Sequence, residues 1–206
     1  MSPKIVDRDE KRREIAIASV EVFGAMGFER TRMEDVAKKA GVGKGTLYEY
    51  FKNKEELMDG AFQVLFGDMM GTLVPEIGPD ESPTKVLIET IRGAMAAMGQ
   101  LGFAYRFFLE YMLHKSRTGD TAELTTFLEA YRHWLADLIQ TGIDRGEYRN
   151  DIVPFETAAA IAAWIDGAGF HWYVMPNSVS LEEMGEHFLA TILDGMKPNT
   201  EKGETP

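Results

Sequence analysis

Apolar residues recur at spacings of three and four along most of the chain, which is the spacing of one face of an α-helix. No stretch alternates apolar and polar residues convincingly enough to indicate a β-strand. Gly, Pro and capping residues separate the periodic segments and set their limits. The pattern predicts an all-α protein of about nine helices, over residues 8–26, 31–40, 44–51, 53–72, 82–98, 103–115, 121–146, 154–175 and 180–196.

Two short helices joined by a Gly-containing turn are predicted near the N-terminus. Thr31 and Glu34 have the spacing of a capping box, in which each side chain bonds the other residue's backbone N–H. Gly41 stands where a left-handed residue ends a helix at low cost. A second short helix then covers residues 44–51. This is the helix-turn-helix plan, whose second helix enters the major groove of DNA.

The segment AGVGKGTLYEYFKNKEEL, from Ala40 to Leu57, resembles the DNA-binding domain of the TetR family of bacterial repressors. The resemblance covers about residues 10–60, and beyond them only the helical layout and the segments DRGEYRND and WIDG look similar. Gly43 departs from the pattern, because the family often has a small polar residue there. The resemblance implies an N-terminal three-helix head, residues 1–55, and a C-terminal ligand-binding and dimerisation body, residues 56–206.

The recognition helix supplies the candidate DNA contacts. Lys44 at its start can donate to guanine, and Thr46 can serve a phosphate or a thymine methyl group. The resemblance implies phosphate contacts from the other residues, those at the start of the first helix touching the flanking strand. The predicted DNA-binding residues are Thr31, Arg32, Lys44, Thr46, Tyr48, Tyr50 and Lys54.

The net charge of −11 at first argues against a nucleic-acid partner, because phosphates are neutralised by Lys and Arg. The charge is unevenly distributed, however. Residues 1–55 hold 12 basic and 10 acidic residues, whereas the remainder holds 10 basic and 23 acidic residues. A mildly basic head on an acidic body would orient the head toward DNA, although the acidity of the body can equally serve solubility alone.

Aromatic and Met side chains concentrate in the middle of the chain and are candidates for an effector pocket, since both offer large or adaptable apolar contact area. An aromatic stripe at helical spacing is equally typical of a plain core, and that alternative stays open. The predicted ligand-binding residues are Met95, Met98, Phe103, Phe107, Tyr111, His114, Trp134, Leu138, Trp164 and Asp166.

The last two helices are rich in small residues that allow close helix approach, and they carry large apolar side chains as well. In the family this pair packs against its twin in a four-helix bundle, which implies a homodimer reading a palindromic operator. The alternative is a core within one chain. The predicted dimer residues are Ile161, Ile165, Ala168, Trp172, Phe188 and Ile192.

Other chemistry finds little support in the sequence. The chain has no Cys, and its four His residues are far apart without a metal-binding motif. No signal peptide or membrane-spanning segment is recognisable, so we expect a cytoplasmic protein without a membrane partner. We expect no catalytic residue, no metal and no cofactor.

These observations predict a DNA-binding transcriptional regulator that is not an enzyme. We expect a repressor that a small hydrophobic or aromatic effector releases from a palindromic operator on double-stranded DNA. Two alternatives remain: an architectural or partner-regulated DNA-binding protein without a small effector, and a helical enzyme with an incidental basic head.

Overall fold

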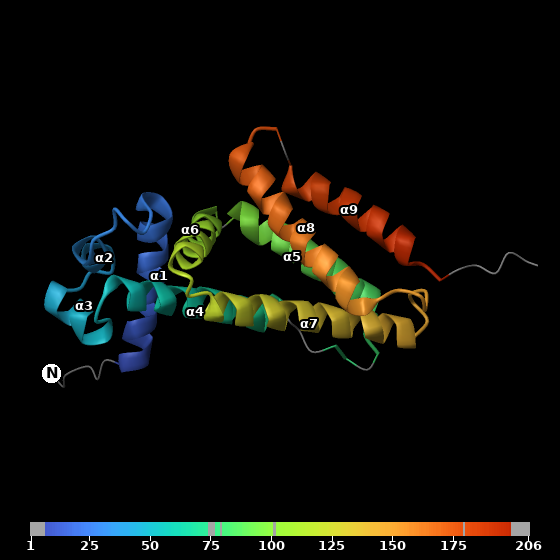
Figure 1. Cartoon of the computed structure of the whole chain (residues 1–206), viewed down its shortest axis with the longest axis horizontal. Coiled ribbons are helices and arrows are strands. Elements are labelled where there is room, and N and C mark those ends of the chain that lie inside the picture. The colour runs from blue at the N-terminus through green and yellow to red at the C-terminus, as the bar shows by residue number, and fades with distance from the viewer. Residues whose placement is uncertain (1–6, 74–76, 79, 101, 179, 199–206) are drawn as a thin grey trace, which may run out of the picture. The chain divides into compact units, whose positions relative to one another are not determined.

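The computed structural model describes residues 7–73, 77–78, 80–100, 102–178 and 180–198, and within them it contains nine α-helices and no strand. The predicted all-α fold is therefore confirmed, and most predicted helix limits agree with the observed ones within a few residues. The helices are α1 Arg8–Met26, α2 Met33–Lys39, α3 Lys44–Tyr50, α4 Lys54–Leu73, α5 Pro83–Gln100, α6 Gly102–Thr118, α7 Ala122–Asp144, α8 Pro154–Val174 and α9 Leu181–Met196 (Figure 1).

The chain forms two compact units that do not follow its order. Unit 1 combines residues 1–72 with residues 101–125, and unit 2 combines residues 73–100 with residues 126–206. Helices α4 and α6 therefore pack in the same unit as the helix-turn-helix. The predicted domain boundary after residue 55 separates residues expected to bind DNA from residues expected to bind a ligand and a second copy. This boundary stays a prediction.

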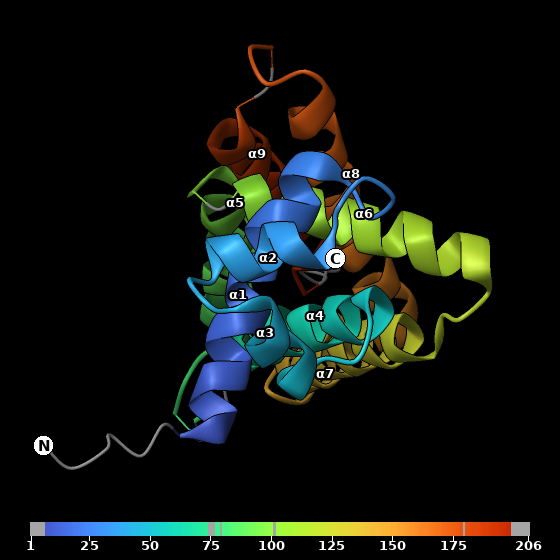
Figure 2. The ribbon, with the colours of Figure 1, turned by 90° about the vertical axis from the view of Figure 1, so that its left-hand side faces the viewer.

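Unit 1 is built on the contact between α1 and α6 (Figure 2). The buried face of α1 consists of Ile15, Ala16, Ser19, Val20 and Phe23. At Gly24 the two backbones come so close that a Cβ atom would lie 2.7 Å from the carbonyl oxygen of Phe103 in α6. Any larger residue at position 24 would push the two helices apart.

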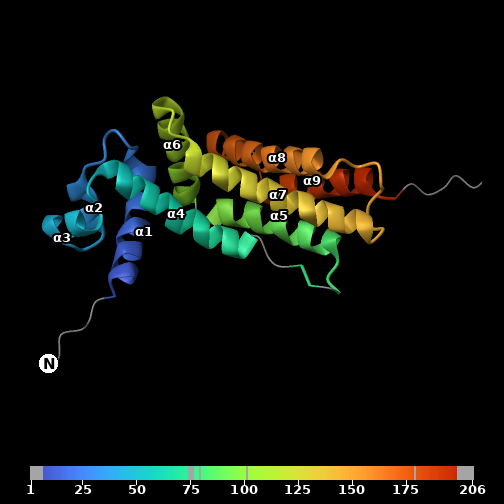
Figure 3. The same ribbon diagram turned by 60° about the horizontal axis from the view of Figure 1, so that its bottom comes forward.

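Unit 2 is a bundle of α5, α8, α9 and most of α7 (Figure 3), in which α5, α8 and α9 contact one another. Its core is one cluster of aliphatic side chains in which Leu87, Ile91, Leu135, Leu138, Ile139 and Ile161 are completely buried. Gly142 in α7 makes room for the ring of Tyr148, because a Cβ atom at position 142 would lie 2.2 Å from that ring. The connection from α7 to α8 is thereby fixed against α7.

Glu147 in the same connection caps the start of α5. Its Oε2 accepts from the backbone N–H of Thr84 at 3.0 Å and from the hydroxyl of Ser82 at 2.7 Å. Burial alone would raise the pKa of Glu147, but the hydrogen bonds from Thr84 and Ser82 outweigh it and hold the pKa below the usual 4.5. The ionised side chain therefore stabilises the fold.

Replacing Glu147 by Gln should lower the free energy of unfolding by about 1 kcal/mol at pH 7, the size of a lost helix cap. Because the pKa is lower in the folded state, this contribution is present above pH 4.5 and is lost as the pH falls through the folded pKa. Urea unfolding at pH 7 and pH 3, at one protein concentration, should show the difference shrinking at acid pH. Glu89→Gln, which removes only a surface pair with Lys85, is the control and should change stability by less.

Candidate functional site

Helices α2 and α3 form the predicted helix-turn-helix. Gly41 after α2 has φ +66°, the left-handed conformation that the sequence predicts. The backbone N–H of Val42 then donates to the carbonyl of Ala37 at 3.0 Å and closes the turn. Leu47 and Phe51 are both completely buried, so they anchor α3 and leave its other face outward.

The outward face of α3 carries the predicted contacts. Lys44 and Tyr48 are exposed, whereas Thr46 and Tyr50 are half-buried. The ammonium of Lys44 pairs with the carboxylate of Glu34 on α2, and this contact raises the pKa of Lys44 and lowers that of Glu34. A phosphate or base that binds Lys44 must therefore compete with Glu34.

Arg12 holds the far end of the recognition helix, a role that the sequence interpretation missed. Its guanidinium donates to the backbone carbonyl of Tyr50 and lies 4.1 Å from the ring centroid of Phe51. A cation at a helix C-terminus satisfies a carbonyl that has no partner within the helix. The sequence shows only that Arg12 is one of several charged residues at the start of α1. It does not show which group Arg12 binds.

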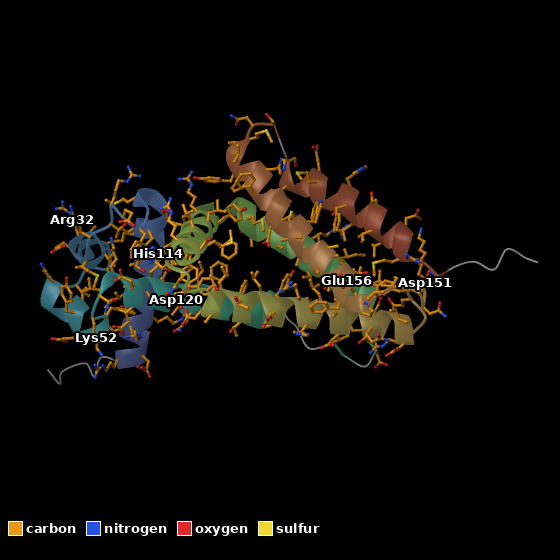
Figure 4. The ribbon with its side chains drawn as sticks, viewed as in Figure 1. Arg32, Lys52, His114, Asp120, Asp151 and Glu156 are labelled. Atoms are coloured by element: carbon orange, nitrogen blue, oxygen red, sulfur yellow. The ribbon has the colours of Figure 1, made fainter. Side chains whose placement is uncertain are left out.

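The predicted capping box at Thr31 is wrong. The N-cap of α2 is Arg32, whose backbone N–H donates to the carboxylate of Asp35 at 3.0 Å. Thr31 is only 2% exposed, and its hydroxyl donates to the carbonyl of Gly27 at 2.8 Å. Thr31 thus supports the turn before α2, and its role as a direct DNA contact stays a prediction. Arg32 is exposed beside α2 and stays a candidate (Figure 4).

The ammonium of Lys54 is engaged within its own chain. Its Nζ donates to the carbonyl of Phe28 at 2.6 Å and lies 4.2 Å from the centroid of the Phe28 ring. These contacts tie the start of α4 to the turn between α1 and α2. The geometry supports a positioning role in place of the predicted phosphate contact, whereas the neighbouring Lys52 is exposed at the end of α3 (Figure 4).

The ten predicted ligand-binding residues do not fall in one unit. Phe103, Phe107, Tyr111 and His114 belong to α6 in unit 1, and the other six belong to unit 2. Phe107 and Tyr111 are completely buried, and His114 stacks on Phe28 with ring centroids 3.7 Å apart. Within unit 1 these three side chains form core, which the sequence left open as the alternative. Phe103 is 39% exposed.

The unit 2 members of the predicted pocket lie together. Met95 and Leu138 belong to its core cluster, and Met98, Trp134 and Trp164 pack against that cluster. Asp166 is solvent-accessible, yet desolvation by the surrounding protein raises its pKa to about 6. A titratable group with a shifted pKa is a candidate for a binding site, so Asp166 stays a predicted effector contact.

A groove of about 780 Å³ runs along α5 and the start of α9 in unit 2. Met95 and Trp172 line it, and Arg92 at its edge forms a two-pronged ion pair with Glu186 at 2.5 and 2.7 Å. Of the residues that line this groove, Met95 is predicted for the ligand pocket and Trp172 for the dimer interface.

Three of the six predicted dimer residues are buried within their own chain, and their role at a dimer interface stays a prediction. Ile161, Ile165 and Ala168 are 0%, 5% and 2% exposed, because they point into the core of their own chain. Trp172, Phe188 and Ile192 are only partly buried. Phe188 stacks on Trp164 with ring centroids 3.9 Å apart, so its ring is already partnered on one side.

In the described residues no group of three His, Cys, Asp or Glu side chains is arranged to hold a metal ion. No helix in the described ranges has the length and hydropathy needed to cross a bilayer.

A buried turn, an anchored short helix and an outward face of Lys, Thr and Tyr define a helix-turn-helix DNA-binding protein. Residues 15–61 match the family described as "Bacterial regulatory proteins, tetR family". Residues 15–61 are therefore a DNA-binding segment of the TetR type, and the chain is a DNA-binding transcriptional regulator.

Relatives match over nearly the whole chain. The HTH-type transcriptional repressor KstR2 of Rhodococcus jostii is 25% identical and covers 90% of this chain and 91% of its own length. The fatty acid metabolism regulator protein of Bacillus subtilis is also 25% identical, over 90% of this chain and 95% of its own. The structure of the fatty acid degradation regulator FadR from Bacillus halodurans has a TM-score of 0.79 at 22% identity, covering 90% of this chain and 95% of that one.

Lys54→Met should weaken DNA binding without changing its salt dependence, because Lys54 positions α4 and does not neutralise a phosphate. Lys52→Met should lower the slope of log affinity against log salt by about one, as expected for a lost phosphate contact. Fluorescence anisotropy with one duplex at several salt concentrations measures both. A slope lowered by Lys54→Met, with an unchanged melting temperature, would restore the predicted phosphate contact.

Proposed function

We propose that the protein is a homodimeric repressor that binds a palindromic operator and leaves it when an apolar effector binds. The observation that carries this proposal is the outward face of α3, where Lys44 and Tyr48 stand exposed on a helix anchored by Leu47. Such a repressor acts on chromosomal DNA, so the proposal includes a cytoplasmic location. One head offers few base contacts, so a second head supplies the affinity and specificity of a palindrome.

A strip on the outer face of α8 is the surface we propose for the second copy. Its members recur at steps of three and four, and none of them is fully buried: Ala160, Ala163, Gly167, Phe170 and Val174. Phe170 and Val174 are 52% and 57% exposed, and exposed apolar side chains that form one continuous strip mark an interaction surface. The small residues permit close approach of two helices, and the large ones supply apolar area for a symmetric interface.

Gly167→Arg should convert the dimer to a monomer, because a Cβ atom at Gly167 meets nothing within 4 Å in its own chain but would meet the partner helix. Gly93→Arg is the matched control on α5, since position 93 is equally open. Light scattering after size-exclusion chromatography gives the mass of each variant. Circular dichroism should show both folded. A dimeric Gly167→Arg protein would exclude this strip as the interface.

The effector proposed here is a molecule with a long apolar part, bound in unit 2. The FadR structure of Bacillus subtilis, 23% identical with a TM-score of 0.78 over 89% of this chain and 98% of that one, is a complex with stearoyl-CoA. In this chain, Trp134, Trp164 and Met98 offer partly buried apolar surface beside the core. The described part of unit 2 carries six Lys and Arg against fourteen Asp and Glu. We therefore assign recognition to the apolar part of the effector and not to anionic groups.

Release would follow from a shift between conformations. An effector that binds better to the conformation with wrongly spaced heads lowers DNA affinity by the ratio of its two affinities. The alternative, a regulator without a small effector, is favoured by the complete burial of Phe107 and Tyr111.

Stearoyl-CoA should displace the protein from its operator and raise its melting temperature, whereas coenzyme A without the acyl chain should do neither. At a hundredfold excess over Kd the ligand adds about 2.7 kcal/mol to stability. Trp134→Ala should abolish both effects and keep DNA affinity in the absence of ligand, and Trp172→Ala should keep both. The reverse result would place the ligand in the groove beside α9. No response of the unmodified protein to stearoyl-CoA would exclude this ligand.

A further inference from the structure

An acidic side chain stands among the predicted DNA contacts of α2 and α3, two helices that pack against each other (Figure 2). Glu34 of α2 pairs with the ammonium of Lys44 at the start of α3, and the two side chains are 52% and 59% exposed. Arg32, two residues before Glu34, is exposed as well. A carboxylate at this surface repels the phosphates of any DNA, so Glu34 lowers the general affinity of the head.

The cap of α2 does not depend on Glu34. The carboxylate of Asp35 accepts from the backbone N–H of Arg32 at 3.0 Å and fills that position. An ion pair between two exposed side chains adds little to stability. The hydrogen bond from Lys44 lowers the pKa of Glu34, and the charge of Arg32 lowers it further, so the carboxylate is ionised at neutral pH. Glu34 therefore acts on the two neighbouring cations through its charge.

The ion pair changes what Lys44 can bind. An ammonium group has three N–H donors. Glu34 uses one of them, and two remain, which is the number that O6 and N7 of one guanine accept. The charge is affected differently, because the paired ammonium and carboxylate together carry no net charge. Both kinds of DNA ligand compete with Glu34, but a phosphate loses most of its attraction to Lys44, whereas a neutral base edge still finds two donors.

Lys44 without this partner would not make the distinction. A Lys side chain is a flexible point charge, and it binds phosphates at any DNA sequence. Leu47, which is completely buried, anchors the backbone of α3 below Lys44. The pair with Glu34 then holds the ammonium beside α2, so that both the backbone and the charged end of Lys44 are positioned before DNA arrives.

We propose that Glu34 is a specificity-determining residue, which cancels the attraction of Lys44 to phosphates and reserves its remaining donors for a guanine of the operator. Glu34 acts through Lys44 and is in this sense a positioning residue. The inference rests on the proposed function, because specificity has a meaning only for a protein that prefers an operator.

The test compares the full-length protein with Glu34→Gln on two duplexes. One is an operator selected from random DNA, and the other has the same length and composition in scrambled order. On the scrambled duplex, Glu34→Gln should steepen the slope of log affinity against log salt by about one, as expected for a gained phosphate contact. With a slope of about −0.9 per contact, referred to 1 M salt, affinity for this duplex rises about eightfold at 0.1 M salt.

The affinity for the operator should rise less, because there Lys44 already contacts a base. The ratio of the two Kd values, which measures specificity, should therefore fall by about fourfold or more. Fluorescence anisotropy at several salt concentrations gives both Kd values and both slopes. A general change of charge would instead strengthen binding to both duplexes by the same factor.

Glu21→Gln is the matched control. Glu21 is also an exposed acid of the head that pairs with a Lys of α2, in its case Lys39. Its replacement removes the same charge and releases a Lys, but it leaves Lys44 paired. This variant should change both affinities equally and keep the Kd ratio.

Lys44→Met tests whether Glu34 acts through Lys44. In that background, Glu34→Gln should change both affinities equally and leave the ratio as it is, which a double-mutant cycle makes visible. If circular dichroism shows that Glu34→Gln loses helix, Glu34→Ala is the second variant, because Ala is a strong helix former. It should give the same fall in the Kd ratio.

An unchanged Kd ratio in Glu34→Gln, or the same fall in the absence of Lys44, would overturn the role of Glu34 and leave the proposed function intact. Failure of the unmodified protein to prefer any duplex would instead overturn the proposed function, and this inference with it.

Discussion

The close approach of α1 and α6 is the constraint on which unit 1 depends. Gly24 permits contact between two helix backbones, and Phe23 and Phe107 then pack across the junction with ring centroids 6.1 Å apart. Because α1 also holds α3 through Arg12, this contact links α6 to the recognition helix. Helix α6, which the sequence assigned to ligand binding, is thereby part of the structural support of the DNA-binding head.

Helices α6 and α4 are joined in unit 1 by aromatic contacts and by an ion pair. The ring of Phe28 lies between His114 of α6 and the ammonium of Lys54 of α4, so the turn before α2 is held from both helices. On the same two helices, Lys115 of α6 also pairs with Asp59 of α4. Apolar packing tolerates small shifts of α6, whereas a buried ion pair does not. The two contacts together link α6 to α4 within unit 1.

The helix limits and the recognition helix could be predicted from the sequence because both depend on local interactions. The cap of α9 by Ser180 and the left-handed Gly41 after α2 occur where the sequence places them. Which side of a helix meets the core depends instead on its neighbours. Ile161 and Ile165 have the spacing of an interface, but α5 and α9 already cover that face within the chain.

Competing partners explain the remaining errors. Thr31 and Glu34 have the residue types and spacing of a capping box, yet Asp35 satisfies the Arg32 N–H and the start of α2 moves by one residue. Lys54 looks like a free cation, but the carbonyl of Phe28 lies within its reach. In the first case a competing neighbour in sequence decided the outcome, and in the second a partner distant in sequence did so. A regulator of this fold is therefore easier to recognise by its DNA-binding segment than by its ligand, since the first depends on neighbours in sequence and the second on neighbours in space.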